Sequence, residues 1–530
     1  MMASDMVGQM LSALRAVAAP LLVMAAWAAA EALRLAQRAG RRPVFLLATW
    51  ALRPWAFWAA LNLFNRVNRR MGFNEPSTFP FYAEPWWRHG SGLAFLAEVA
   101  ASGHFWTWLA VFAVSAAALV AIVGRVARSA VEPGWLAGAC TAGVVAALAF
   151  CLGVGLAHLP EPARAGKPGS FLAPWHNPSS TLLYAMPLAR DEAAFIRDFV
   201  RIQPRLRKTI HGLSHPPGAV LSLRLIGRLA GAGSDIRNDS VKRRYALGLA
   251  AFGALNALAI YWLAASIGRS RRTGLAASAL WAASPAALSY MTFAQDLVYG
   301  LFFNLGLALG WRAAVSERPS WPVAVALGVV LACAAMLNYS WIVLGTIIGC
   351  FGLMTGICGK WSAAQWALRL CMPFAVAGLL IGAVLLTFEL DYTGAFRVSS
   401  AYVREWYRFD GVYQWCLALV GGQVDLWLMM GSVALTAFLS AVFRGTGAPP
   451  APAVRYLWTV LAVLAMPVLA GPNALKMETS RCWGWALSVP FAFAAARLLA
   501  AGRPAMFVQA ALAASLCAAL VMRLVMDFGV

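Results

Sequence analysis

Long apolar runs that are almost free of charge recur along this chain, and they constrain its fold more than any other feature. Each is about 17–25 residues long, which is enough for a helix to cross a bilayer. Backbone groups inside a bilayer must be hydrogen-bonded within the segment, so these runs predict helices. We therefore expect an all-α polytopic membrane protein with about fourteen transmembrane helices. The expected helices cover residues 16–33, 43–64, 103–124, 134–158, 245–267, 273–290, 296–312, 320–337, 340–357, 366–387, 414–441, 455–471, 483–500 and 504–522.

Charge predicts how these helices are oriented. The chain of 530 residues is 61% hydrophobic and only 12% charged, with a net charge of +22. Its Lys and Arg residues lie mainly in short loops between apolar runs, which favours the positive-inside rule and excludes nucleic acid as a partner. One side, predicted to be cytoplasmic, receives the short loops 34–42, 124–133, 268–274, 311–320, 359–361, 443–452 and 501–504.

The opposite side is expected to carry most of the titratable groups. It receives 65–102, 159–244, 388–413 and 471–482, and all six histidines lie in or beside these segments. Part of this clustering reflects the need of polar residues for water. A transporter would more often place such groups at mid-membrane. The clustering therefore favours an enzyme that acts at one face. The aromatic loop 65–102 is predicted to form an interfacial belt or to stack on sugars.

The segment 159–244 is the longest one expected outside the membrane. Its first part is rich in Pro, Gly and Ser and is predicted to be irregular. Residues 190–208 then have helical spacing, with Phe195, Phe199 and Ile202 on one face.

A second amphipathic helix is expected to begin within the sequence His-Pro-Pro-Gly at 215–218. Ser214 or His215 can precede this helix, because proline is tolerated in a first helical turn. Leu221, Leu225 and Leu229 form an apolar stripe beside two arginines four residues apart. The run is too short and too charged to span, so we expect it to lie in the membrane interface. A plain surface helix with solvated arginines is the alternative.

No cofactor is expected, and the evidence for a metal is weak. His211 and His215 have a metal-compatible spacing, but Pro216 and Pro217 disfavour a regular helix through them. The nine cysteines include no CxxC pair, so neither a zinc site nor a disulfide framework follows. The run 16–33 is followed by a basic segment and is interpreted as a retained helix, not a signal peptide.

Four segments together resemble the GT-C glycosyltransferases, membrane enzymes that include protein O-mannosyltransferases and aminoarabinose transferases. The sequence His-Pro-Pro-Gly at 215–218 resembles the element that opens a juxtamembrane helix in bacterial members. The other three segments, which follow in the expected order, are 284–310 with Pro285 and Asp296, 328–344 with Asn338-Tyr339, and 476–496 with Glu478, Arg481 and Pro490. The resemblance covers roughly residues 134–525. It implies a GT-C-like transmembrane domain at 131–530 and leaves 1–130 as an N-terminal extension with about three helices.

The resemblance implies transfer of a sugar from a polyprenyl-phosphate donor to an unidentified glycan, lipid or protein acceptor at the outer face of a bacterial inner membrane. The family places a catalytic Asp early in the long loop, where this chain has none. Asp191 or Asp198 is then the candidate base, with Asp296 as a further acid. The residues expected to bind the donor or its phosphate are His211, His215, Arg224, Tyr339, Lys476, Glu478 and Arg481.

Structural roles remain open for several of these residues. Asp296 is alternatively an N-cap of the next helix, Glu478 a partner of Arg481, and Arg481 a residue that reaches to the membrane interface. Two other functions also remain open: a transporter or lipid flippase, and a non-catalytic scaffold that kept the fold. The missing early Asp favours the scaffold.

Overall fold

The computed structural model describes residues 103–159, 170–176, 182–208, 210–233, 235–406, 426–427, 429–444, 451–469 and 483–525. These ranges are mostly helical and contain no strand, in agreement with the expected all-α membrane protein. Six helices among them are long and apolar enough to cross a membrane. They are α4 (Gly103–Arg128), α5 (Trp135–His158), α11 with α12 (Asp239–Ala254 and Asn256–Gly268), α15 (Asp296–Val315), α17 (Trp341–Cys358), and the helix from α18 (Ala363–Trp366) through η7 (Ala367–Cys371) to α19 (Met372–Phe388).

Eight further helical segments of the described ranges pack with these six or with one another. The expected helix 273–290 is broken, because Ser284 caps a new helix through the backbone N–H of Ala287 and Pro285 has no N–H to continue the old one. The eight are α13 (Arg271–Ala282), α14 (Pro285–Tyr290), α16 (Trp321–Leu337), α22 (Ser432–Arg444), α23 (Ala451–Leu469), η8 (Gly484–Leu487), α25 (Ser488–Leu499) and α26 (Pro504–Val525). The expected helices 16–33 and 43–64 lie outside the described residues.

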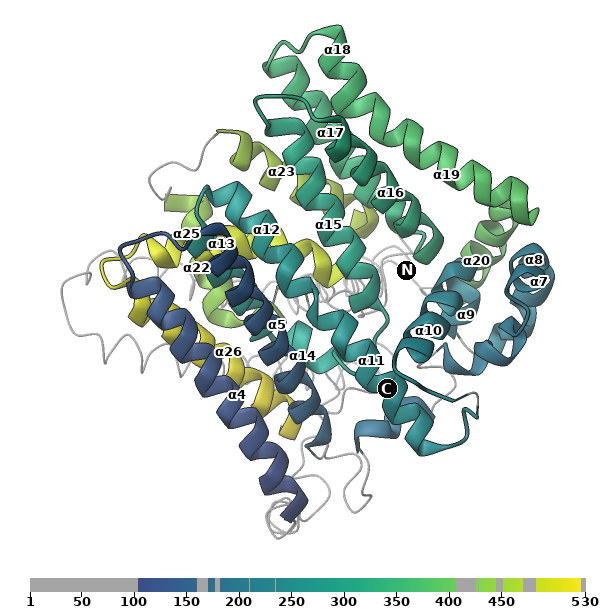
Figure 1. Ribbon diagram of the computed structural model, residues 1–530, viewed down its shortest axis with the longest axis horizontal. Coiled ribbons are helices and arrows are strands. Elements are labelled where there is room, and N and C mark those ends of the chain that lie inside the picture. Colours follow the sequence, from purple (N-terminus) through teal and green to yellow (C-terminus); the bar gives the residue numbers. More distant parts are fainter. Residues whose placement is uncertain are drawn as a thin grey trace, which may run out of the picture.

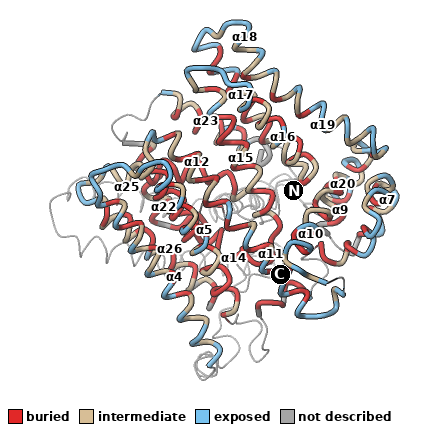
Figure 2. Tube along the Cα trace, viewed as in Figure 1, coloured by how far each residue is buried: buried red, intermediate tan, exposed pale blue. Residues whose placement is uncertain are grey.

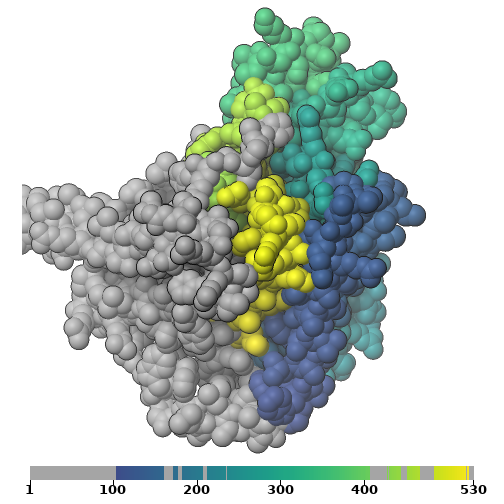
Figure 3. Space-filling model, turned by 90° about the vertical axis from the view of Figure 1, so that its left-hand side faces the viewer, coloured from purple at the N-terminus to yellow at the C-terminus, as the bar shows by residue number. Residues whose placement is uncertain are grey.

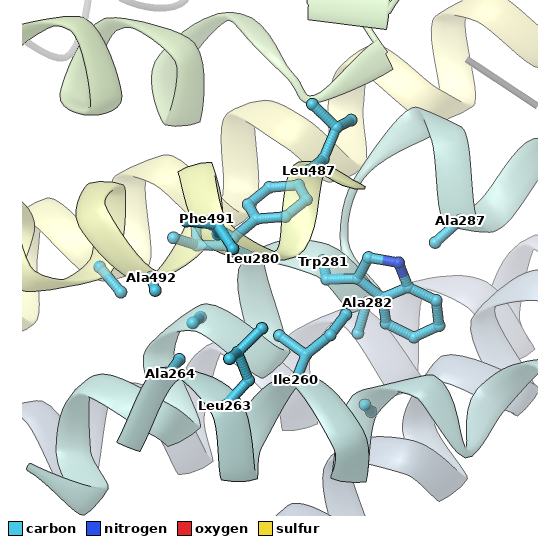
Figure 4. Close-up of a cluster of buried hydrophobic side chains, with 14 of the residues drawn as sticks. Ile260, Leu263, Ala264, Leu280, Trp281, Ala282, Ala287, Leu487, Phe491 and Ala492 are labelled. Carbon is cyan, nitrogen blue, oxygen red and sulfur yellow. The ribbon is translucent and has the colours of Figure 1, made fainter. Parts of the chain in front are cut away.

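At the centre of the bundle, α12 packs against α13, α15 and α25, and α13 also packs against α25 (Figure 1). Figure 4 shows Ile260, Leu263, Trp281 and Phe491 meeting there, and all four are at most 3% exposed. Alanines fill the remaining contacts, so the helix backbones approach closely, as is common where helices pack in membranes.

Two helices occupy opposite rims of the bundle. In Figure 3 the C-terminal α26 lies beside α4, which it contacts. On the other rim, the most apolar stretch of α18–α19 is only 11% buried, compared with 72% for α15. This difference is visible in Figure 2 as a mostly unburied α19 and a mostly buried α15. The apolar side chains of α19, including Leu379 and Leu386, are therefore positioned to face lipid.

A layer of short helices lies at one end of the bundle, beside the end of α19 (Figure 1). We call residues 182–229 together with 392–406 the short-helix layer. Phe195 and Phe199 are buried within it, although Asp198 divides the expected single helix in two. Its elements are η5 (Leu183–Ala189), α7 (Glu192–Arg197), α8 (Phe199–Ile202), η6 (Gln203–Lys208), α9 (Ile210–Ser214), α10 (Pro217–Leu229) and α20 (Tyr392–Trp406).

Just before the layer in sequence, η4 (Ser170–Leu172) and α6 (Ala173–His176) pack against each other, and η4 also packs against α5 and α11. Trp175 is 1% exposed, and its indole N–H donates to the carbonyl of Thr292, 3.1 Å away. This hydrogen bond attaches the start of the 159–244 loop to the turn that precedes α15.

The loops predicted to be cytoplasmic also contact one another. Glu132, between α4 and α5, accepts hydrogen bonds from Ser270 Oγ at 2.6 Å and Arg272 Nε at 3.1 Å at the start of α13. Arg369 donates to the carbonyls of Ala314 and Glu317, at the end of α15. The contacts of Glu132 are the ones expected of two loops that share one side of a membrane, whereas Arg369 belongs to the helix from α18 to α19.

Candidate functional site

The sequence His-Pro-Pro-Gly at 215–218 forms the turn between α9 and α10. Helix α9 ends at Ser214, Pro216 is the N-cap of α10 and Pro217 is its first residue. The N-cap is thus Pro216 and not Ser214 or His215 as expected from the sequence. A proline fits here because the first N–H groups of a helix have no partner within it. A regular helix does not run through His211 and His215, in line with the sequence expectation.

Gly218 fixes where this turn sits against the bundle. A Cβ atom at this position would lie 2.3 Å from the carbonyl oxygen of Met336, near the end of α16. Only glycine therefore permits the start of α10 to approach the α16 backbone so closely.

The His215 side chain lies between the turn and α15. Its Nδ1 is 2.9 Å from Ser214 Oγ, and its ring centroid is 5.3 Å from that of Tyr299. Gln295 Nε2, just before α15, donates to the carbonyl of Ala219 at 3.3 Å. The start of α15 is therefore attached to the start of α10 by two independent contacts.

Asp296 is the first residue of α15 and is half-buried. The N-cap is Gln295, so the interpretation of Asp296 as the N-cap is wrong. A carboxylate in the first turn of a helix is favoured by the unpaired N–H groups there. Asp296 lies one residue from Gln295 and one turn from Tyr299, which places it close to the 215–218 turn along α15.

Tyr339 lies in the turn between α16 and α17, three residues after Met336. Its ring packs edge-on against Tyr392 and Phe396 of α20, with centroids 5.5 and 5.2 Å apart. The Tyr339 hydroxyl oxygen is shielded from solvent and has no hydrogen-bond partner among the described residues. Burial raises the pKa of this phenol, so it remains a neutral hydrogen-bond donor. An unpaired buried hydroxyl is costly, and a ligand oxygen would relieve that cost.

The two loop aspartates have structural partners. Asp191 caps α7, where its Oδ1 accepts from the backbone N–H of Ala194 at 3.0 Å. Asp198 Oδ2 accepts from Arg201 Nη2 at 2.8 Å. Both interactions are local, and both fully account for a carboxylate at these positions.

Arg224 is held against η5 and α7. Its Nη1 donates to the carbonyl of Ala189 at 2.6 Å, and its Nε is 3.2 Å from Glu192 Oε1. Its side chain is only 18% exposed. Arg224 lies on α10 about two helical turns after the first residue of that helix, Pro217.

The structure thus groups some of the predicted residues and not others. His215 and the start of α15 adjoin the beginning of α10, and Tyr339 follows three residues after Met336 with its ring against α20. Arg224, in the middle of α10, is held instead beside α7, which Asp191 caps. The side chain of His211 and the residues Lys476, Glu478 and Arg481 lie outside the described part. No cluster of three or more metal-ligating side chains occurs among the described residues.

Sequence reasoning missed three residues of this region. Gln295 and Tyr299 lie in the segment 284–310, but no sequence pattern there distinguishes them from their neighbours. Gln203 is fully buried and donates to the carbonyls of Leu213, at 2.7 Å, and Ala395, at 3.2 Å. Its role depends on a contact between segments almost two hundred residues apart, which no local pattern predicts.

Comparison with protein-family models, with curated proteins and with solved structures found no match for this chain.

Proposed function

We propose that this protein is a membrane glycosyltransferase of the GT-C type, with about fourteen transmembrane helices in all. It transfers a sugar from a polyprenyl-phosphate donor to an acceptor at the extracytoplasmic face of a bacterial inner membrane. The observation that carries the proposal is the meeting of three sequence-distant segments at the 215–218 turn. Two contacts define it: Gln295 donates to Ala219, and Gly218 lies against Met336.

The fourth segment that resembles the family also reaches α15. The Trp485 ring packs edge-on against Phe303, with centroids 4.8 Å apart, and a Cβ atom on Gly300 would touch Trp485 at 3.5 Å. All four segments are therefore attached to the same helix or to the turn beside it. This arrangement supports a common site more strongly than any single motif does.

The reaction assigns a role to each residue near the turn. Asp296 accepts the proton of the acceptor hydroxyl while the oxygen of that hydroxyl bonds to the anomeric carbon of the sugar. The bond from that carbon to the donor phosphate breaks, and polyprenyl phosphate leaves. Tyr339 and His215 donate hydrogen bonds to the leaving phosphate, whose charge develops in the transition state. Asp191 and Asp198 are less suited to act as the base, because they lie at the two ends of α7 and not at the start of α15 beside the turn.

The test is transfer by the purified full chain from a panel of polyprenyl-phosphate sugars into membrane extract. We expect Asp296→Asn to lower the rate at least about a hundredfold, as for loss of a general base. Asp198→Asn serves as the matched control and should retain most activity. Equal rates for Asp296→Asn and the unsubstituted chain, at equal protein level, would exclude the assignment of Asp296.

One observation favours a second candidate. The local partners of Asp191 and Asp198 are those of structural residues, which is what a non-catalytic scaffold with this fold would show. The same assay decides between the two, because a scaffold would transfer no sugar from any donor in the panel.

A further inference from the structure

The outer side of α10 carries an apolar ridge beside a charged one. Leu225 and Leu229 are 54% and 67% exposed, and Leu221 on the same side is half-buried. Arg224 and Arg228 follow the neighbouring line of the helix, four residues apart, as i and i+4 positions share a face. The opposite side of α10 is buried against the bundle, so this double ridge faces outward.

Glu192 of α7 is shared by both arginines. Its Oε1 lies 3.2 Å from Arg224 Nε and also accepts from Arg228 Nη2. No other acid pairs with either arginine among the described residues. Two positive charges thus face one negative charge, which leaves a net charge of +1.

The two arginines are held differently. Arg224 has a second anchor in the carbonyl of Ala189 and is largely buried, whereas Arg228 is 59% exposed and is held by Glu192 alone. An exposed ion pair of this kind contributes little to stability, so Arg228 exchanges readily to another anion.

The double ridge adjoins two apolar helices of the bundle. Helix α10 begins against Met336, next to the end of α16, and α7 contacts α19. Both α16 and the α18–α19 helix are apolar, so lipid chains can reach this part of the molecule.

We propose that Arg224, Arg228 and the leucine ridge bind an anionic phospholipid of the surrounding bilayer. Its phosphate replaces Glu192 at Arg228, and its acyl chain lies along Leu225 and Leu229. Charge complementarity selects this occupant: the cluster needs one more negative charge, and a lipid phosphate brings that charge together with an apolar chain. The site is separate from the turn at His215 and does not depend on transfer activity.

The experiment measures hydrogen–deuterium exchange of the full chain in lipid nanodiscs, at the backbone amides of 217–231. Four conditions are compared: phosphatidylcholine alone, and phosphatidylcholine with phosphatidylglycerol, with a polyprenyl phosphate, or with inorganic phosphate in the buffer. We expect phosphatidylglycerol to slow exchange relative to phosphatidylcholine alone. Arg228→Gln should reduce that effect about fivefold, the equivalent of about 1 kcal/mol for one arginine near an anionic lipid.

Two further variants make the test specific. Glu192→Gln removes the competing carboxylate and should enlarge the effect of phosphatidylglycerol. Arg237→Gln changes an exposed arginine just beyond α10 and should leave the effect of phosphatidylglycerol unchanged. The proposal is overturned if phosphatidylglycerol gives no protection, or if Arg228→Gln behaves as the unsubstituted chain. Protection by the polyprenyl phosphate alone would mean that the arginines bind the sugar donor. Equal protection by inorganic phosphate would mean that they bind a phosphate without any need for a lipid chain.

Discussion

Gln203 shows how much a single buried amide contributes to the short-helix layer. Its side chain is 0% exposed, and its Nε2 joins α9 to α20 through the carbonyls of Leu213 and Ala395. Ser399 makes a parallel link, since its hydroxyl donates to the carbonyl of Ser214 at 3.0 Å. The position of α20 therefore depends on a few polar contacts in addition to apolar packing.

We predict that Gln203→Leu loosens α20. The substitution keeps most of the side-chain volume but leaves two carbonyls without their donor, at a cost of about 1–3 kcal/mol. Hydrogen–deuterium exchange of residues 392–406 should become faster. Arg205→Gln, two residues away and exposed, is the control. Unchanged exchange in α20 would show that its docking does not depend on the amide.

At the scale of elements, α10 shows what sequence could and could not predict. Its start at the two prolines and its failure to span were predictable from local rules. Its buried face was not, because the leucine stripe lies outward while Ala219, Val220 and Leu223 pack inward. Small residues let two helix backbones approach closely. Whether a face with small residues is the buried one depends on the partner helix, which the sequence alone does not identify.

The approach of α10 to α16 gives a prediction at this scale. Gly218→Ala adds a methyl group that meets the Met336 carbonyl, so we expect a loss of about 1–3 kcal/mol in stability. Gly378→Ala is the matched control, because a Cβ atom there has no neighbour within 4 Å among the described residues. Thermal unfolding in detergent should separate the two variants, with Gly378→Ala neutral or slightly more stable. Equal melting temperatures would contradict the close contact.

A second element-level prediction concerns the junction of the α4–α5 loop with α13. Partial burial raises the pKa of Glu132, but hydrogen bonds from Ser270 and Arg272 and the charge of Arg272 outweigh it and lower the pKa below its usual 4.5. A lowered pKa in the folded state means that the carboxylate stabilises the fold above about pH 4.5, and that this contribution is lost as pH falls through the folded value.

We therefore expect Glu132→Gln to be less stable than the unsubstituted chain at pH 7, by under about 1 kcal/mol because the side chain is partly exposed. The difference should shrink as the pH is lowered below 4.5. Melting curves at pH 7, 5 and 4 provide the measurement. A difference that stays constant over this range would mean that the carboxylate charge plays no part.

At the scale of the whole molecule, some loops expected on the same side contact one another. Segments 182–229 and 392–406 meet in the short-helix layer, and the loop before α5 meets the start of α13 at Glu132. The expected division itself comes from the positive-inside rule, which acts on whole loops. The sequence could not predict which aspartates are structural, since Asp191 and Asp198 acquire their roles from the ends of α7.

The division into two sides predicts a labelling pattern. In a variant without the nine cysteines, single cysteines are introduced by Arg205→Cys, in the short-helix layer, and by Arg318→Cys, between α15 and α16. A membrane-impermeant maleimide should label the first in intact spheroplasts and the second only after permeabilisation. The opposite pattern would invert the proposed orientation and place the site at the cytoplasmic face.

The short connection between α19 and α20 has a mechanical consequence. Helix α19 leans on α16 but exposes most of its length to lipid, and three residues later the chain enters α20, which Gln203 fixes to α9. A spanning helix tilts when the hydrophobic thickness around it changes. In a thicker or thinner membrane, a change in the tilt of α19 would therefore shift the start of α20. Because Tyr392 and Phe396 of α20 pack against Tyr339, membrane thickness would alter the position of Tyr339.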